Sequence, residues 1–231
     1  MPTLLITGAN RGIGLALCQL TAAEGWTIHA CCRQLKKAKE LKELQAQYPE
    51  NIQCHVLDVK SHKSLEALQE SIGSTPIDVL INNAGVHALA ASKFGDSADD
   101  AWQEAVGVNL LAPMKMMELF VDNIATSTMK TIANISSKMG SIDDNGSGGA
   151  YAYRATKAAL NAVSVSAAHD LKHRDIIVMI LHPGWVRTDM GGPHGEISVS
   201  ESAIQLLDMI TNADMNKSGR FLDIDGSEIA W

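Results

Sequence analysis

The chain has 231 residues, of which 46% are hydrophobic and 19% are charged, and its formal net charge is -7 at pH 7. This length is enough for one large domain with a sizeable core, and the mildly acidic balance argues against a nucleic-acid binder with a broad basic surface. No apolar run reaches the roughly 18 residues of a membrane-spanning helix, and we expect no signal peptide. Four cysteines without a C-x-x-C pair do not suggest a disulfide framework. We therefore expect a cytoplasmic protein that binds neither nucleic acid nor a membrane.

Short β-like runs alternate with longer helical stretches along the chain. Strands are predicted at 3–7, 27–32, 53–57, 79–82, 131–136, 176–182 and 220–224, and several are apolar throughout, as parallel strands are when helices cover both faces. Helices are predicted at 13–24, 35–48, 63–72, 99–121, 151–173 and 202–211. This alternation predicts an α/β fold with a doubly wound parallel sheet, a Rossmann fold, of about seven strands flanked by helices on both faces. We expect one such domain over 1–231, with its ligands in the loops at the carboxyl ends of the strands.

The first predicted strand leads directly into a glycine-rich turn that opens a helix. Residues 7–14 read T-G-A-N-R-G-I-G. Glycine lets the backbone turn tightly and approach a phosphate, and the free N–H groups and helix dipole then bind the anion. The spacing differs from the commonest dinucleotide fingerprint, G-x-G-x-x-G. The placement after a strand nevertheless favours a pyrophosphate-binding turn over an ordinary glycine turn.

A second pattern is a tyrosine followed by a lysine four residues later, Tyr153 and Lys157. On a helix these two side chains share one face, so the ammonium group lies near the phenol. A nearby cation favours phenolate and lowers the pKa of tyrosine from its usual value near 10, which makes a general acid or base at neutral pH. The spacing alone is weak evidence, because it also arises by chance.

Polar residues stand at the ends of later predicted strands. N-N-A-G occupies 82–85, two serines occupy 136–137, and P-G occupies 183–184, while Asn109 lies inside a predicted helix. Each has an ordinary explanation, because Asn-Gly and Pro-Gly form turns and serine caps helices. Their joint occurrence at one edge of a sheet indicates a site instead.

Together these motifs resemble the short-chain dehydrogenase/reductase family in its single-domain branch. The resemblance covers nearly the whole chain and follows the order of the family: T-G-x-x-x-G-x-G at 7–14, N-N-A-G at 82–85, Asn109, Ser137, Y-x-x-x-K at 153–157, and P-G with a following threonine at 183–188. It implies an NAD(P)-binding Rossmann domain whose substrate site is built from the loops at the carboxyl edge of the sheet.

The resemblance implies a catalytic role for four residues. Tyr153 is expected to be the acid/base, and Lys157 to lower the pKa of Tyr153 and to hydrogen-bond the nicotinamide ribose. Ser137 is expected to hold the substrate oxygen, with Ser136 as an alternative. Asn109 is expected to position a water molecule that links Lys157 to solvent.

The resemblance also implies a set of cofactor-binding residues, in which Asp58 contacts the adenine and Thr188 steadies the carboxamide. The full set is Gly8, Asn10, Arg11, Gly12, Ile13, Gly14, Arg33, Asp58, Val59, Asn83, Ala84, Gly85, Tyr153, Lys157, Pro183, Gly184, Val186 and Thr188.

The end of the second strand bears on the choice of cofactor. NAD-preferring proteins place Asp or Glu there, on the ribose 2′-hydroxyl. This chain has A-C-C-R at 30–33, and Arg11 lies in the glycine turn. Two guanidinium groups that converge on one point suit a 2′-phosphate, although a single Arg33 facing solvent is an ordinary alternative. The sequence predicts NADP(H), preferred over NAD(H).

We therefore expect an oxidoreductase that transfers hydride from NADPH to a ketone or aldehyde, of the carbonyl reductase or alcohol dehydrogenase type. The stretches 135–142 and 183–192 are most similar to C-factor-type proteins and sniffer-like carbonyl reductases. The C-factor likeness keeps open an alternative, an NAD(P)-binding signalling or regulatory protein with little turnover. The expected partner is a small carbonyl or alcohol substrate, whose identity depends on the loops at 86–94, 143–150 and 190–199.

Two further expectations concern metals and assembly. His169 and His173 share a helix face but lack an acidic partner at H-E-x-x-H spacing, so we expect no metal site. The helix at 99–121 is apolar nearly all round, and the helix at 151–173 is rich in small residues. Because members of the family commonly dimerise through these two helices, we expect a homodimer.

Overall fold

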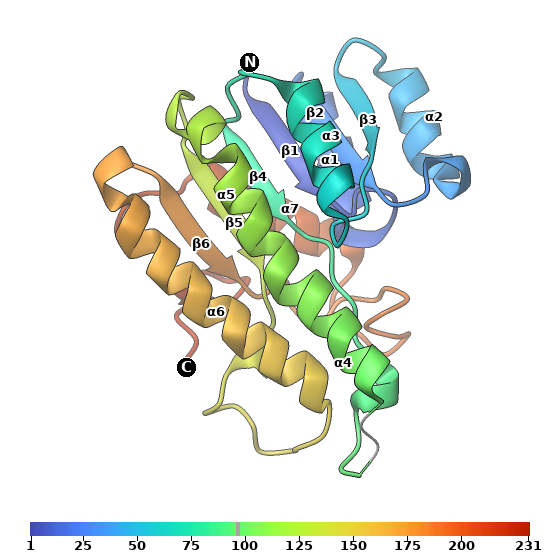
Figure 1. Cartoon of the computed structure of the whole chain (residues 1–231), viewed down its shortest axis with the longest axis vertical. Coiled ribbons are helices and arrows are strands. Elements are labelled where there is room, and N and C mark those ends of the chain that lie inside the picture. The colour runs from blue at the N-terminus through green and yellow to red at the C-terminus, as the bar shows by residue number, and fades with distance from the viewer. Residues whose placement is uncertain (96–97) are drawn as a thin grey trace.

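Seven short apolar segments form one parallel sheet in the computed structural model, which describes residues 1–95 and 98–231. The order of strands is β3-β2-β1-β4-β5-β6-β7 (Figure 1). The strands are β1 (Thr3–Thr7), β2 (Thr27–Cys32), β3 (Ile52–Val56), β4 (Val79–Asn82), β5 (Thr131–Ile135), β6 (Ile177–Leu181) and β7 (Phe221–Leu222). The order reverses between β1 and β4, and ligands of doubly wound sheets bind at this switch point. The predicted fold class is confirmed.

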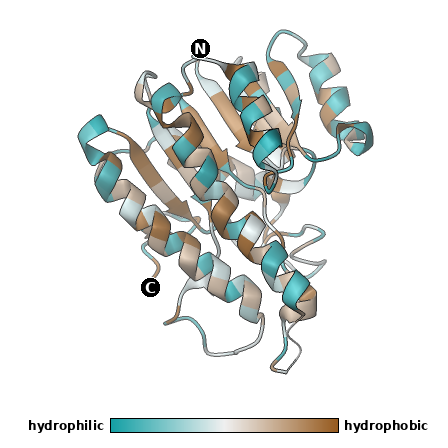
Figure 2. Cartoon of the chain, viewed as in Figure 1, coloured by the Kyte–Doolittle hydropathy of each residue, from teal (hydrophilic) through white to brown (hydrophobic). Residues whose placement is uncertain are grey.

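Helices cover both faces of the sheet and divide its core in two. One core packs α1 (Gly12–Ala23), α2 (Lys39–Gln47) and α7 (Val199–Thr211) against the sheet. The other packs α3 (His62–Ile72), α5 (Ala112–Ala125) and α6 (Tyr151–Leu171) against the opposite face. Figure 2 shows hydrophobic strands at the centre and helices that alternate hydrophobic with hydrophilic residues. This pattern is the reason that several strands read as continuous apolar runs in the sequence.

The single helix predicted at 99–121 is interrupted in the structure. It is three joined pieces: α4 (Asp99–Val106), a π-helical turn η3 (Gly107–Leu111) and α5. In η3 the N–H of Ala112 donates to the carbonyl of Gly107, five residues back. Pro113 explains the widening, because it has no N–H and its ring crowds the carbonyl four residues earlier, that of Asn109. Such single π turns occur frequently at functional sites.

Other boundaries shift by a few residues. The predicted helix at 35–48 is a 3-10 turn, Leu35–Lys37, followed by α2, and the predicted strand at 220–224 shortens to the two residues of β7. Helix α7 begins at Val199, three residues earlier than predicted, because Ser198 and Glu201 form a capping box.

Buried polar side chains join α6 to the sheet. Nδ2 of Asn82 donates to Oδ1 of Asn134 at 2.8 Å, and Nδ2 of Asn134 donates to Oγ of Ser164 at 2.8 Å. One turn earlier on α6, Oδ1 of Asn161 accepts a 2.5 Å hydrogen bond from Oγ of Ser136. These hydrogen bonds form together at only one position of the helix, so the network fixes where α6 lies along β4 and β5.

Among the described residues, no helix combines the length and the apolarity that crossing a membrane requires.

Candidate active site

A cavity of about 560 Å³ opens at the carboxyl ends of the strands, beside the switch point between β1 and β4. It gathers most of the residues that the sequence nominated for cofactor binding. Those that line it are Gly8, Asn10, Arg11, Gly12, Ile13, Arg33, Asp58, Val59, Asn83, Ala84, Gly85, Tyr153, Lys157, Pro183 and Thr188. Gly14, Gly184 and Val186 do not line it, and neither do Asn109 and Ser137.

The glycine turn is fixed by hydrogen bonds with the residues after β4, and its other side borders the cavity. Gly8 and Gly12 have φ of +69° and +54°, values that favour glycine. The side chain of Asn83 donates to the carbonyls of Thr7 and Gly8 at 3.0 and 3.1 Å, and Oγ1 of Thr7 accepts from the N–H groups of Asn83 and Ala84 at 3.1 and 3.0 Å. A Cβ on Gly14 would lie 2.4 Å from the carbonyl oxygen of Gly8, so Gly14 serves the packing of this turn. The resulting cradle fits a pyrophosphate at the start of α1.

Lys157 and Tyr153 face each other in the buried part of the site. Nζ of Lys157 donates to the carbonyl of Ile135 at 2.7 Å and lies 5.8 Å from the centre of the Tyr153 ring. The lysine is only 4% exposed, and burial lowers its pKa to about 8. At pH 7 the ammonium group therefore keeps its charge.

The ionisation of Tyr153 differs from the sequence expectation. Burial raises the pKa of the phenol above its ordinary value of 10, and the interaction with the Ser137 hydroxyl acts in the opposite direction. Desolvation of the phenolate is the dominant effect, and the lowering expected from Lys157 does not set the direction of the shift. The phenol consequently holds its proton at neutral pH, which suits a general acid.

The two neighbouring serines separate into different roles. Ser136 lines the cavity wall, but its Oγ is committed to Asn161. Ser137 instead turns toward Tyr153, and its Oγ accepts the N–H of Met139 at 3.2 Å, which starts the 3-10 turn Lys138–Gly140. Of the two alternatives left by the sequence, Ser137 is the one beside the phenol.

The side-chain amide of Asn109 is fully buried, at 0% exposure, and it forms hydrogen bonds with the backbone of Val86. Its Oδ1 accepts the N–H of Val86 at 2.9 Å, and its Nδ2 donates to the carbonyl of Val86 at 2.9 Å and to Oγ1 of Thr156 at 3.1 Å. The side chain thus joins the loop at Val86 to α6. The backbone carbonyl of Asn109 receives no hydrogen bond from Pro113, which has no N–H, and it is a candidate to hold the expected water molecule.

The two arginines, Arg11 and Arg33, line the same cavity. The guanidinium group of Arg11 forms an ion pair with Asp189, which also lines this cavity. Both partners are largely exposed, so the ion pair is weak and the arginine is free to exchange it for an anion. Glu40 of α2 also lines the cavity and was not predicted. No motif marks Glu40, which reaches the cavity wall through the packing of α2 against β3 and α1.

Sequence reasoning also missed His87. Its ring stacks on that of Tyr153, with centroids 4.8 Å apart and an angle of 17° between the planes. The available signal was its position, two residues after N-N-A-G in a loop assigned to the substrate pocket.

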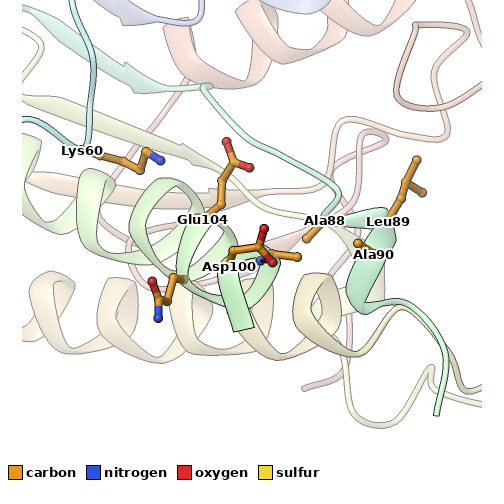
Figure 3. Close-up of a pocket in the computed structure, with 8 residues that line it drawn as sticks. Lys60, Ala88, Leu89, Ala90, Asp100 and Glu104 are labelled. Carbon is orange, nitrogen blue, oxygen red and sulfur yellow. Dashed lines mark hydrogen bonds between the residues drawn. The ribbon is translucent and has the colours of Figure 1, made fainter. Parts of the chain in front are cut away.

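A second cavity, of about 730 Å³, lies between α4 and residues 88–90 (Figure 3). Lys60, Asp100 and Glu104 extend into it. Residues 88–90 belong to the loop 86–94 that was expected to shape the substrate pocket, but none of the catalytic or cofactor-binding residues nominated from the sequence lines this second cavity. The smaller cavity is therefore the candidate active site.

Comparison with known proteins agrees with this geometry. A family model described as short chain dehydrogenase matches residues 2–197. The chain belongs to the short-chain dehydrogenase/reductase family. It is therefore an oxidoreductase of that family.

Individual members of the family are similar over most or all of the chain. The C-signal protein of Myxococcus xanthus is 36% identical over 72% of this chain and 100% of its own length. Among solved structures, the carbonyl reductase Sniffer of D. melanogaster has a TM-score of 0.91 and 30% identity, with 100% of both chains covered. An NADPH-bound carbonyl reductase from chicken fatty liver has a TM-score of 0.93 and 32% identity, with 100% of this chain and 99% of that chain covered.

The two serines give a test of the site. We expect Ser137→Ala to lower kcat by roughly 100-fold, because in the role that the family resemblance implies for Ser137 it removes a hydrogen-bond donor to the substrate oxygen. The matched variant Ser136→Ala should keep kcat near that of the parent while lowering the free energy of unfolding by about 1–2 kcal/mol, since the buried Asn161 loses its donor. Steady-state kinetics and urea unfolding measure the two effects. A Ser136→Ala variant that lost turnover instead would reverse the assignment.

Proposed function

We propose that this protein is an NADPH-dependent carbonyl reductase, able in reverse to act as an alcohol dehydrogenase. The observation that carries the proposal is that Tyr153 and Lys157 line the same cavity as the glycine turn, and that the Ser137 hydroxyl interacts with the Tyr153 phenol. Both solved structures compared above are carbonyl reductases, and the one from chicken fatty liver has NADPH bound, which supports the proposal.

Each part of the cavity has residues that fit a part of this cofactor. The open cradle of the glycine turn would hold the pyrophosphate on backbone N–H groups. Asp58 and Val59 would flank the adenine, Lys157 would reach the nicotinamide ribose, and Thr188 the carboxamide. When bound, NADPH supplies the hydride that reduces the carbonyl carbon of the substrate.

The residues of the chain supply the proton and the charge. Tyr153 gives its phenolic proton to the carbonyl oxygen, so hydride and proton together convert the ketone or aldehyde into the alcohol. Ser137 donates a hydrogen bond to the same oxygen while negative charge develops there. The Lys157 ammonium group then stabilises the phenolate that remains. Reprotonation of Tyr153 would proceed from solvent through Lys157 and a water held by the Asn109 carbonyl.

We propose NADPH as the preferred cofactor because no carboxylate occupies the end of β2. Cys32 and Arg33 line the cavity there, and Arg11 reaches it from the glycine turn. A 2′-phosphate would draw Arg11 away from Asp189, because a dianion offers charge-assisted hydrogen bonds that the exposed ion pair does not match.

The main test is NADPH oxidation, followed by absorbance, against quinones, diketones, aldehydes and ketosteroids. We expect turnover of at least one class. Tyr153→Phe should lower kcat by about 1000-fold or more, because it removes the general acid, and the variant should still bind NADPH. Tight NADPH binding without turnover by the parent protein on any compound would favour the alternative, a signalling or regulatory NADPH-binding protein.

Cofactor preference can be tested on the arginines. The double variant Arg11→Ala/Arg33→Ala should raise KM for NADPH by roughly 100-fold and KM for NADH only slightly, because NADH has no 2′-phosphate to lose contacts with. Arg174→Ala is the control. Arg174 follows the C-terminal end of α6, far along the helix from Tyr153, and forms an ion pair with Asp122 of α5. An equal increase in KM for NADPH and for NADH would contradict the proposed preference for NADPH.

We also propose a homodimer formed through the α4–η3–α5 segment and α6, which lie side by side (Figure 1). Leu111, in η3, is 54% exposed although it is large and apolar. Burial of such surface against a second copy would stabilise the assembly. Sedimentation at micromolar concentration should give twice the mass of the chain, and a monomeric mass would contradict the proposal.

A further inference from the structure

His87 places an aromatic ring against the catalytic tyrosine. It follows β4 at the start of the loop that leads to α4, and its imidazole lies nearly parallel to the phenol, at 4.8 Å and 17°. Aromatic rings gain from such contacts beyond the area that they bury. The ring therefore restricts the freedom of the side chain that would deliver the proton.

Stacking, rather than a side-chain hydrogen bond through Nδ1, holds this ring. Nδ1 of His87 is buried and has no hydrogen-bond partner within the described part of the chain. Burial also lowers the pKa of His87, so the ring is neutral at pH 7 and adds no charge beside Lys157. The face of the imidazole is thus the part that interacts with Tyr153.

The backbone on the N-terminal side of His87 is fixed to the helix that carries Tyr153. Val86 gives both its N–H and its carbonyl to the Asn109 amide, which also donates to Oγ1 of Thr156. Thr156 lies one turn after Tyr153 on α6, and its hydroxyl donates to the carbonyl of Ala152 at 2.7 Å. Loop, π turn and α6 are therefore joined by one chain of hydrogen bonds beside the stacked rings.

The backbone on the C-terminal side is equally constrained. Ala88 has φ of +53°, a conformation that L residues rarely adopt, and its carbonyl accepts the N–H of Ala91 at 2.9 Å. Val86 lines the candidate active site, whereas Ala88, Leu89 and Ala90 line the second cavity (Figure 3). His87 thus lies in the chain between Val86 of one cavity and residues 88–90 of the other, with its ring stacked on Tyr153.

We propose that His87 is a positioning residue for Tyr153, a role that rests on the proposed function: the imidazole covers one face of the phenol, holds the ring at a fixed angle to the cavity and keeps water away from it. Loss of the ring would let the phenol swing and become hydrated. The rate of proton transfer would then fall, while the cofactor site at the glycine turn would stay intact.

Kinetics of two variants separate this role from a general structural one. His87→Ala should lower kcat by roughly 10- to 100-fold, because the acid is misplaced, and leave KM for NADPH unchanged. His87→Phe keeps a ring that stacks and should restore kcat to within a few-fold of the parent. His173→Ala, at an exposed histidine beyond the far end of α6, should change neither. If His87→Ala does not fold, His87→Gln replaces it, since glutamine keeps a polar side chain without the ring.

A spectroscopic measurement does not require turnover. The chain has three tyrosines, so carbon-13 labelling of the phenols gives few signals, and Tyr153→Phe identifies the relevant one. Because burial raises the pKa of Tyr153, we expect this pKa to move down toward its ordinary value in His87→Ala and to stay raised in His87→Phe.

The outcomes are distinct. An unchanged kcat and an unchanged Tyr153 pKa in His87→Ala would overturn the proposal, and so would a His87→Phe variant that behaves like His87→Ala. If the parent protein reduced no carbonyl compound but the Tyr153 pKa shifted as expected, the proposed function would fail and the positioning of Tyr153 by His87 would stand.

Discussion

The candidate active site depends on the buried amide of Asn109. Both of its polar atoms are used to hold Val86, and one also reaches Thr156, so three segments distant in sequence are fixed relative to one another. The π turn at Gly107–Leu111 makes this possible by widening the helix where Pro113 interrupts its regular hydrogen bonds. Without the amide, the N–H and the carbonyl of the half-buried Val86 would lose these partners, and a backbone group shielded from water without a partner is destabilising.

Burial then sets the charges within this frame. It raises the pKa of Tyr153 and lowers that of Lys157 to about 8. Each shift disfavours a charged form, yet at neutral pH one positive charge remains, on Lys157, with a backbone carbonyl as its hydrogen-bond partner. The site therefore rests with a neutral acid beside a cation. In the proposed reaction, this arrangement favours a negative charge on the phenol only when a substrate oxygen is present to take the proton.

The sequence predicts the frame of the site better than its contacts. Apolar runs reveal strands, glycines reveal the turn, and the spacing of Tyr153 and Lys157 places them on one helix face, because each is a local property of the chain. The π turn is not predictable in this way, since Pro113 signals an interruption without saying how the helix absorbs it. Whether Ser136 or Ser137 faces the phenol depends on the last residue of β5. The partners of Arg11, Asn109 and His87 are set by loops that carry no periodic pattern.

The polar network between α6 and the sheet limits which substitutions this part of the chain can accept without losing the position of α6. Apolar surfaces tolerate sliding, whereas Asn161 and Ser164 meet their partners on β5 and in the residue after it at one offset only. Replacing the network with leucine and alanine would leave a cohesive core but would remove the feature that makes one helix position preferable to its neighbours. The buried polar groups of this chain therefore define the position of α6 rather than add to the stability of the core. The position of Tyr153, in the first turn of α6, depends on them.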